Sequence, residues 1–302
     1  MRRILLILVL AVAAATAGCG SVVRVAYNNG DVAARFKAHE YFDLHGEQSD
    51  RLKAQIARFH AWHRREELPR YAALFGDASA RLAAGLTRAD VAWAIAAVRE
   101  RYRVTVEQAA DEFAPVAATM DPDNLAALER KLAENNEQFA RDFLSGDAAM
   151  QARARARRLS GWVDDWLGTV TPEQEALIAA FVQAQPELDR VRLEDRRRRQ
   201  REFVALLRAH GKAPDLAARL RDYLVNWERD RGAEHRRQAR AWEDRLVTLI
   251  VDLDGSLTPQ QRDHVVRRFA FFAAEARVLA RQGVPAGTTA GAPAGAALAA
   301  QL

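Results

Sequence analysis

Apolar residues recur along most of this chain at intervals of three and four residues, the spacing of one face of an α-helix. The stretches 52–63, 93–104 and 125–139 follow this pattern. Ala, Arg, Leu and Glu, which favour helices, dominate the composition, and no long alternation of Val, Ile or Thr indicates a strand. The pattern predicts an all-α fold, an elongated bundle of many helices.

Turn residues divide this pattern at several points. Asp-Pro at 121–122 is typical of a helix start, and the Gly-containing segments 145–147 and 211–214 are expected to separate helices. Pro69 is expected to end a helix at about Glu67, because proline disfavours a helical conformation in the residue before it.

Three segments share a pattern centred on threonine, LTRAD at 86–90, VTPEQ at 170–174 and LTPQQ at 257–261. Each is typical of a capping box, in which the Thr hydroxyl and the side chain three residues later bond each other's backbone N–H. Proline at the first helical position fits this interpretation. The alternative is a true repeat of three loosely similar helical units. Both interpretations stay open at this point.

The first residues have the pattern of a secretory signal. Two arginines, Arg2 and Arg3, precede an apolar run of about 14 residues at 4–17, and Cys19 follows. The run is shorter than the roughly 20 apolar residues of a membrane span. We therefore predict that residues 1–18 are removed and that Cys19 is acylated. The alternative is cleavage after Ala17 by the ordinary signal peptidase.

This interpretation divides the chain into four parts. Residues 1–18 are the signal peptide, 19–31 carry the lipid anchor and a short tether, 32–282 form the helical domain, and 283–302 form a disordered tail. The tail contains no charged residue and is rich in Gly, Ala, Thr and Pro, which favours disorder. Within the tether, YNNGD at 27–31 is expected to form a turn and to cap the next helix through its aspartate.

The predicted anchor also sets a location. Gly20, rather than Asp, follows Cys19, and in bacterial lipoproteins this favours the periplasmic face of the outer membrane. Loss of Arg2 and Arg3 would lower the formal net charge from +5 to +3. This charge is too small to indicate nucleic acid as a partner. With one cysteine, the chain forms no internal disulfide.

Arginine is concentrated at 190–201, which contains seven arginines. Four consecutive arginines, 196–199, cannot share one face of a helix, so part of the run must lie in solvent. The simplest interpretation is an exposed helix with ion pairs between residues four apart. The alternative is a contact surface for acidic partners, for which we select Arg190, Arg197 and Arg201.

A second cluster contains groups that bind metals. On one helix, His60, His63 and Glu67 would lie on the same face, where imidazole and carboxylate can hold zinc or copper. A zinc protease would need a catalytic glutamate between histidines four residues apart, which this segment lacks. The alternative is a helix end whose polar groups pair with neighbours.

Trp162 and Trp166 share a helix face, and we expect them to anchor the core; a surface for apolar clients is the alternative. No nucleophile elbow, phosphate-binding loop, dinucleotide fingerprint or paired-carboxylate site is present in the sequence. We therefore predict a protein that is not an enzyme and that needs no cofactor.

The motifs at 170–174 and 257–261 resemble the LTxxQ motif of small helical periplasmic stress chaperones. Those proteins are curved all-helical dimers that hold unfolded clients on a partly basic concave surface. The resemblance covers these few residues only, and the spacing between the motifs is about twice that of the chaperones.

A broader resemblance is to an uncharacterised family of helical bacterial lipoproteins. It rests on YNNGD at 27–31, YFDL at 41–44 with Gln48, and WHRREELPRY at 62–71. The resemblance implies an all-helical envelope protein anchored to a membrane, and it implies no activity.

Together these patterns predict an outer-membrane-anchored periplasmic lipoprotein that acts by binding, either in envelope maintenance or by holding unfolded polypeptide. Its partners would be the membrane, through the acyl anchor, and unfolded or other envelope proteins. The sequence does not determine the oligomeric state. The alternatives are a metal-binding envelope protein that uses His60, His63 and Glu67, and a purely structural scaffold.

Overall fold

The computed structural model describes residues 20–185, 188–210, 212–229 and 231–282. These residues form helices and their connections, and no strand occurs among them, so the predicted all-α fold is confirmed. The predicted signal peptide, Cys19 and the tail at 283–302 lie outside the described residues. Within the described part of the chain, no helix combines the length and the apolar character needed to cross a bilayer.

The helices follow one another with short connections. They are α2 (Gly20–Asn28), α3 (Gly30–Phe42), α4 (Glu47–Trp62), the π-helix η1 (His63–Glu67), α5 (Leu68–Ala84), α6 (Arg88–Ala117), α7 (Pro122–Phe143), α8 (Ala148–Leu167), α9 (Pro172–Gln183), α10 (Leu188–His210), α11 (Leu216–Val225), α12 (Ala233–Gly255) and α13 (Pro259–Arg281).

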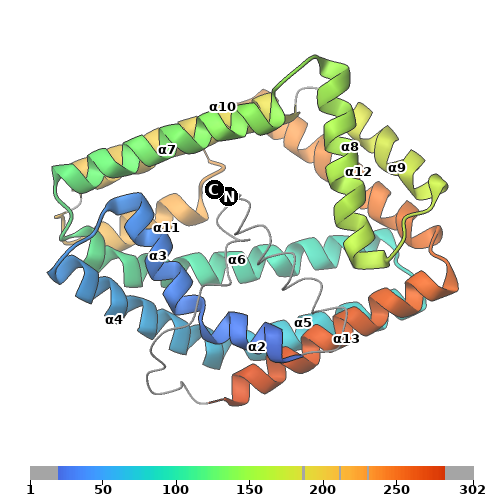
Figure 1. The fold of residues 1–302 in the computed structure, drawn as a ribbon, viewed down its shortest axis with the longest axis horizontal. Helices are drawn as coiled ribbons and strands as arrows, with labels where there is room; N and C mark the ends of the chain where they lie inside the picture. The colour runs from blue at the N-terminus through green and yellow to red at the C-terminus, as the bar shows by residue number, and fades with distance from the viewer. Residues whose placement is uncertain (1–19, 186–187, 211, 230, 283–302) are drawn as a thin grey trace.

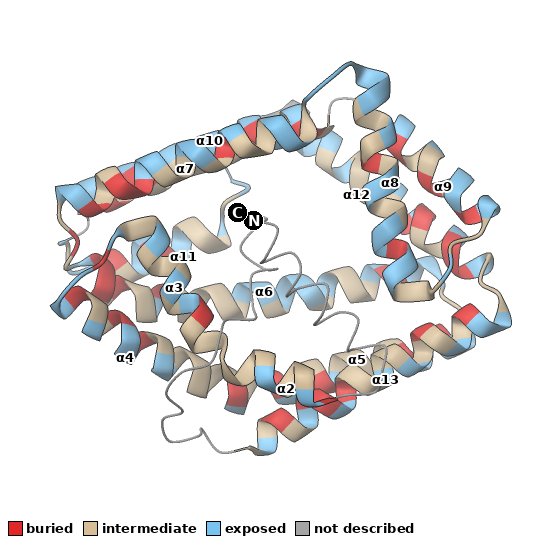
Figure 2. Cartoon of the chain, viewed as in Figure 1, coloured by how far each residue is buried: buried red, intermediate tan, exposed pale blue. Residues whose placement is uncertain are grey.

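These helices pack mainly in pairs, which are arranged as the sides of an open frame (Figure 1). Helix α5 lies against α13, α6 against α11, α7 against α10, and α8 against α9. Each pair joins segments that bury apolar faces against each other, and the exposed faces point outward (Figure 2).

The buried apolar residues form three separate clusters. The largest joins α3, α4, α6, α7, α10 and α11 around Leu128 and Leu220. A second joins α2, α5 and α13 around Leu279, and a third joins α8, α9 and α12 around Ile178. Leu128, Leu279 and Ile178, one from each cluster, are each almost completely buried, so each cluster contributes its own hydrophobic stabilisation.

Three local predictions are wrong, two for residues 19–31 and one for Pro69. The expected tether at 19–31 is helical from Gly20, because α2 packs its apolar side on α13. Only Asn29 interrupts the helices there, and Asp31 does not cap α3. The helix also continues past Pro69, because η1 widens the turn before it. The Leu68 N–H donates to the carbonyl of His63, five residues back, and this wider turn accommodates the proline ring.

The predicted helix starts are confirmed. Thr87, Thr171 and Thr258 each form a capping box with the side chain three residues later. Asp121 does the same with Asn124. Local sequence therefore sets these four helix N-termini.

Two of the capping boxes meet in space, although they are far apart in sequence. The amide of Gln174 donates to the side-chain oxygen of Gln261 at 2.9 Å, and the amide of Gln261 donates back at 3.0 Å. Both side chains are buried, and each also donates to a backbone carbonyl of the other motif's loop, at Ser256 or Thr169. This amide pair joins the N-termini of α9 and α13.

A second amide pair joins α4 and α7 at the other end of the frame. The amide of Gln48 donates to the side-chain oxygen of Asn124 at 2.8 Å, and Asn124 donates to the carbonyls of Phe42 and Asp43. Asn124 is 1% exposed, so these groups have no access to water as an alternative partner. In both pairs, a side-chain amide in the first turn of one helix hydrogen-bonds to a side-chain amide in the first turn of another.

We predict that the substitution Gln174→Ala destabilises the protein by about 1–3 kcal/mol, because the buried amide of Gln261 loses one of its two acceptors and the oxygen of Gln261 loses a donor. Chemical denaturation of the purified protein measures this loss. The matched control is Gln183→Ala on the same helix, where the side chain is exposed and the expected change is small. Equal losses in the two variants would contradict the prediction.

Candidate functional site

Helix α10 divides its arginines between two sides. Arg198 is held by Asp195 and Glu202, and the guanidinium of Arg199 lies 4.2 Å from the centre of the Trp227 ring. The three arginines selected from the sequence are exposed and lie on one stripe of the helix, and the first of them pairs with Glu194 at 2.7 Å; they are Arg190, Arg197 and Arg201.

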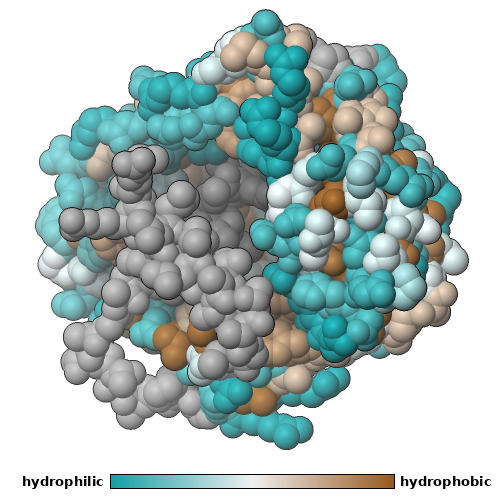
Figure 3. Space-filling view, turned by 45° about the vertical axis from the view of Figure 1, so that its right-hand side comes forward, coloured by the Kyte–Doolittle hydropathy of each residue, from teal (hydrophilic) through white to brown (hydrophobic). Residues whose placement is uncertain are grey.

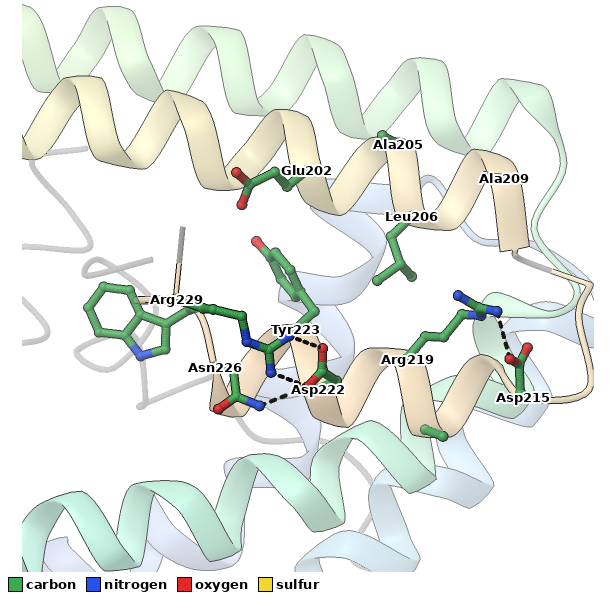
Figure 4. A pocket seen from close by; sticks show the side chains of 12 residues that line it. Glu202, Ala205, Leu206, Ala209, Asp215, Arg219, Asp222, Tyr223, Asn226 and Arg229 are labelled. Atoms are coloured by element: carbon green, nitrogen blue, oxygen red, sulfur yellow. Dashed lines mark hydrogen bonds and ion pairs between the residues drawn. The ribbon is translucent and has the colours of Figure 1, made fainter. Parts of the chain in front are cut away.

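The stripe of exposed arginines leads toward a groove between α10 and α11 (Figure 4). Ala205, one turn after Arg201, lies on its wall, and the groove encloses about 680 Å³. Helix α11 packs mainly on α6 and only slightly on α10, so the facing sides of α10 and α11 stay apart. Small side chains leave the space open, since Ala205, Ala209 and Ala218 are exposed along it.

Charged residues line the α11 side of the groove, and they pair with one another. Arg219 contacts Asp215 at 2.8 Å, and Arg229 contacts Asp222 at 2.5 Å. Hydrogen bonds from Arg229 and Asn226 lower the pKa of Asp222. These pairs form a charged rim around a floor of small apolar residues (Figure 4).

Two aromatic residues complete the groove wall. Trp227 lies between Arg199 and Arg231, each 4.2 Å from its ring centre, and Asp195 holds Arg231 at 2.8 Å. Tyr223 donates to the carbonyl of Arg199 at 2.7 Å, and burial raises its pKa to about 12, so its hydroxyl stays neutral. The wall is therefore held to α10 by stacked cations and a hydrogen bond.

The sequence pattern did not predict a groove beside the arginine-rich helix. Its signal was the series of alanines that follows the arginine run on the exposed side of the same helix, but alanine is common in helices. Trp227 is half-buried in the groove wall.

The proposed metal ligands do not form a metal site. His60 bonds the carbonyl of Tyr27 at 3.1 Å, and His63 lies 3.0 Å from the Tyr27 hydroxyl. Glu67 is fully buried and is bound by Arg101 at 3.0 Å and by Arg70 at 3.1 Å. Across the described residues, no group of three or more His, Cys, Asp and Glu is placed to hold a metal ion.

These residues belong instead to a polar cluster that fastens α2 to the body. Arg64 donates to Asn28 at 2.6 Å and to the carbonyl of Leu279 at 3.0 Å, and its guanidinium lies over the Tyr27 ring. Burial, together with the nearby His60 and Arg64, lowers the pKa of the His63 imidazole from 6.5 to about 4. Burial also raises the pKa of Tyr27 to about 12.

We predict that this cluster makes the protein less stable in acid. Between pH 6.5 and about 4 the unfolded chain binds a proton at His63 that the native state does not, so the unfolding free energy falls as the pH falls. The full shift corresponds to a loss of at most about 3 kcal/mol. His63→Gln should flatten this part of the stability profile.

Denaturation midpoints measured across this pH range provide the test. His45→Gln, at an exposed histidine, is the matched control and should retain the slope of the native protein. A His63→Gln profile that is parallel to the native one would contradict this account of the cluster.

Comparison with known proteins identifies a family. Residues 40–236 match the model of a family of unknown function (DUF6279), and this range includes the arginine-rich helix and the whole groove. None of the curated proteins and none of the solved structures compared with the chain matches it. The prediction of a family without known function is confirmed, and the match covers more than half of the chain. The chain thus belongs to the family DUF6279.

Proposed function

We propose that this protein is an acyl-anchored lipoprotein on the periplasmic face of the outer membrane, and that it binds polypeptide segments in the groove between α10 and α11. The basic residues, apolar run and cysteine at the start of the chain support the anchor. The groove supports the binding part of the proposal, because it is open along its length and combines an apolar floor with a charged rim.

The groove has the chemistry of a site for a helical or extended peptide. Apolar side chains of a client would fill the space above Ala205, Ala209 and Ala218, which is the arrangement of helix-in-groove recognition. The exposed arginines on the same helix would attract acidic segments and raise the rate of encounter. Trp227 would contact a client mainly through its ring edge, since Arg199 and Arg231 stack on the ring and hold it in place.

We predict that Ala205→Trp weakens the binding of an unfolded client at least tenfold, because the indole fills the groove. A tenfold loss corresponds to about 1.4 kcal/mol. Fluorescence anisotropy with labelled, reduced and carboxymethylated α-lactalbumin, an acidic unfolded polypeptide, measures the affinity. Ala54→Trp, at an exposed alanine on α4, is the matched control and should bind as the native protein does.

The arginines are tested in the same assay. The double substitution Arg197→Glu and Arg201→Glu should weaken binding and reduce its dependence on salt. The control with the same change of charge is Arg153→Glu with Arg157→Glu, on the exposed side of α8. If the native protein fails to bind the client, or if groove and control variants bind equally well, the polypeptide-binding proposal is wrong.

Acylation of Cys19 leads to a separate prediction. In cells that are fed an alkyne analogue of palmitate, the protein should become labelled and remain with the outer-membrane fraction. Cys19→Ser should abolish the label and release the protein, because the only thiol of the chain is lost. An unlabelled native protein, or one that retains residues 1–18, would overturn the anchor.

A further inference from the structure

The chain that follows Cys19 is fastened to the body from its first residue. Gly20 begins α2 and is buried there. A Cβ atom at Gly20 would lie 2.8 Å from Cδ of Glu275 and 2.9 Å from Nη2 of Arg24, so the backbone of Gly20 lies directly against this ion pair. Arg24 in turn donates to Glu275 at 2.8 Å. No flexible spacer therefore separates Cys19 from the folded body.

Helix α2 runs parallel to α13. Arg24 meets Glu275 near the start of α2, and Asn28 meets Gln282 at its end. The apolar side of α2, with Val23, packs on the same part of α13. The two helices therefore follow the same direction, and the first turn of α2 lies beside residue 275.

Helix α8 covers the preceding part of the same side of α13. Arg268 donates to the carbonyl of Asp165 at 2.6 Å, and the ring of Phe272 lies 5.9 Å from that of Trp166. The start of α2 thus lies along α13 just after the end of α8 (Figure 1).

Aromatic side chains lie on the end of α8 and on the part of α13 that precedes Glu275. We call them the aromatic face; they are Trp162, Trp166, Phe269, Phe271 and Phe272. Trp162 is 61% exposed, which contradicts its predicted place in the core, and its ring lies 6.2 Å from Trp166. Trp166, Phe269, Phe271 and Phe272 are only half-buried. Apolar areas lie between hydrophilic residues on this side of the molecule (Figure 3).

On the basis of the proposed acyl anchor, we propose that the aromatic face rests on the bilayer surface, so that the anchor holds the body in one orientation. Acyl chains on Cys19 would enter the bilayer one residue from the buried Gly20, which brings the neighbouring surface to the lipid headgroups. Tryptophan is favoured at this depth, because its ring is apolar and its N–H is polar. Arg268, 4.8 Å from the Trp166 ring, supplies a cation for lipid phosphates.

The test uses the full-length protein, purified from membranes and reconstituted in phosphatidylethanolamine–phosphatidylglycerol vesicles with brominated acyl chains. Bromine quenches the emission of nearby tryptophans. We expect quenching of the native protein and at least a twofold smaller quenchable fraction in Trp162→Phe, which removes the most exposed ring of the face. The matched control is Trp93→Phe on α6, where the guanidinium of Arg81 covers the tryptophan ring. This variant should retain the quenching of the native protein.

A second variant tests the rigid connection. Ten Gly and Ser residues inserted between Cys19 and Gly20 leave the fold intact and should lower the quenching at least twofold, because the body can then leave the surface. Acylated native protein that is not quenched, or that is quenched equally in Trp162→Phe and Trp93→Phe, overturns the bilayer contact and leaves the anchor in place. Protein that is never acylated overturns the anchor and, with it, this inference.

Discussion

Two pairs of buried amides hold the ends of the helices together, and the rest of the frame depends on them. Gln174 with Gln261, and Gln48 with Asn124, each lie in the first turns of two helices that meet at their N-termini. The first N–H groups of a helix have no partner within it, and two N-termini carry partial charges of the same sign. A side-chain amide can serve two helix ends at once. Its oxygen accepts a hydrogen bond from the backbone N–H at the start of its own helix, and its N–H donates to an oxygen of the other motif.

The groove is a consequence of how the frame is assembled. Helix α10 is held by α7, and α11 is held by α6, so the facing sides of α10 and α11 have no need to close on each other. The Trp227 stack then fixes the loop after α11 against α10, and the small residues of α10 keep the space open. The charged groups of the rim are paired with one another, which leaves the space between the two helices lined mainly by small side chains.

The N-terminal helix changes how an acyl anchor would act. A lipoprotein on a long tether samples many orientations, whereas α2 is bound to α13 by an ion pair, an apolar cluster and the buried cation of Arg64. Burial of Arg64 and Glu67 is tolerated because each finds charged or carbonyl partners across helix boundaries. The same contacts engage the histidines that resembled metal ligands.

The sequence by itself determined the helical class, the capped helix starts at Asp121, Thr171 and Thr258, and the presence of an arginine-rich helix. These features depend on neighbours within one or two turns, and such neighbours are visible in the chain. Arg190, Arg197 and Arg201 lie on one exposed side of α10, as helical spacing predicts, and their contact with acidic partners stays a prediction.

Only the tertiary structure decided which distant residues meet. It brought Gln174 to Gln261, paired Glu67 with Arg101, placed α2 where a tether was expected, and left Trp162 exposed. It also allowed Pro69 within a continuous helix, through one wider turn. The physical reason is that local patterns fix backbone conformation, whereas the partner of a buried polar or aromatic side chain depends on how whole helices pack.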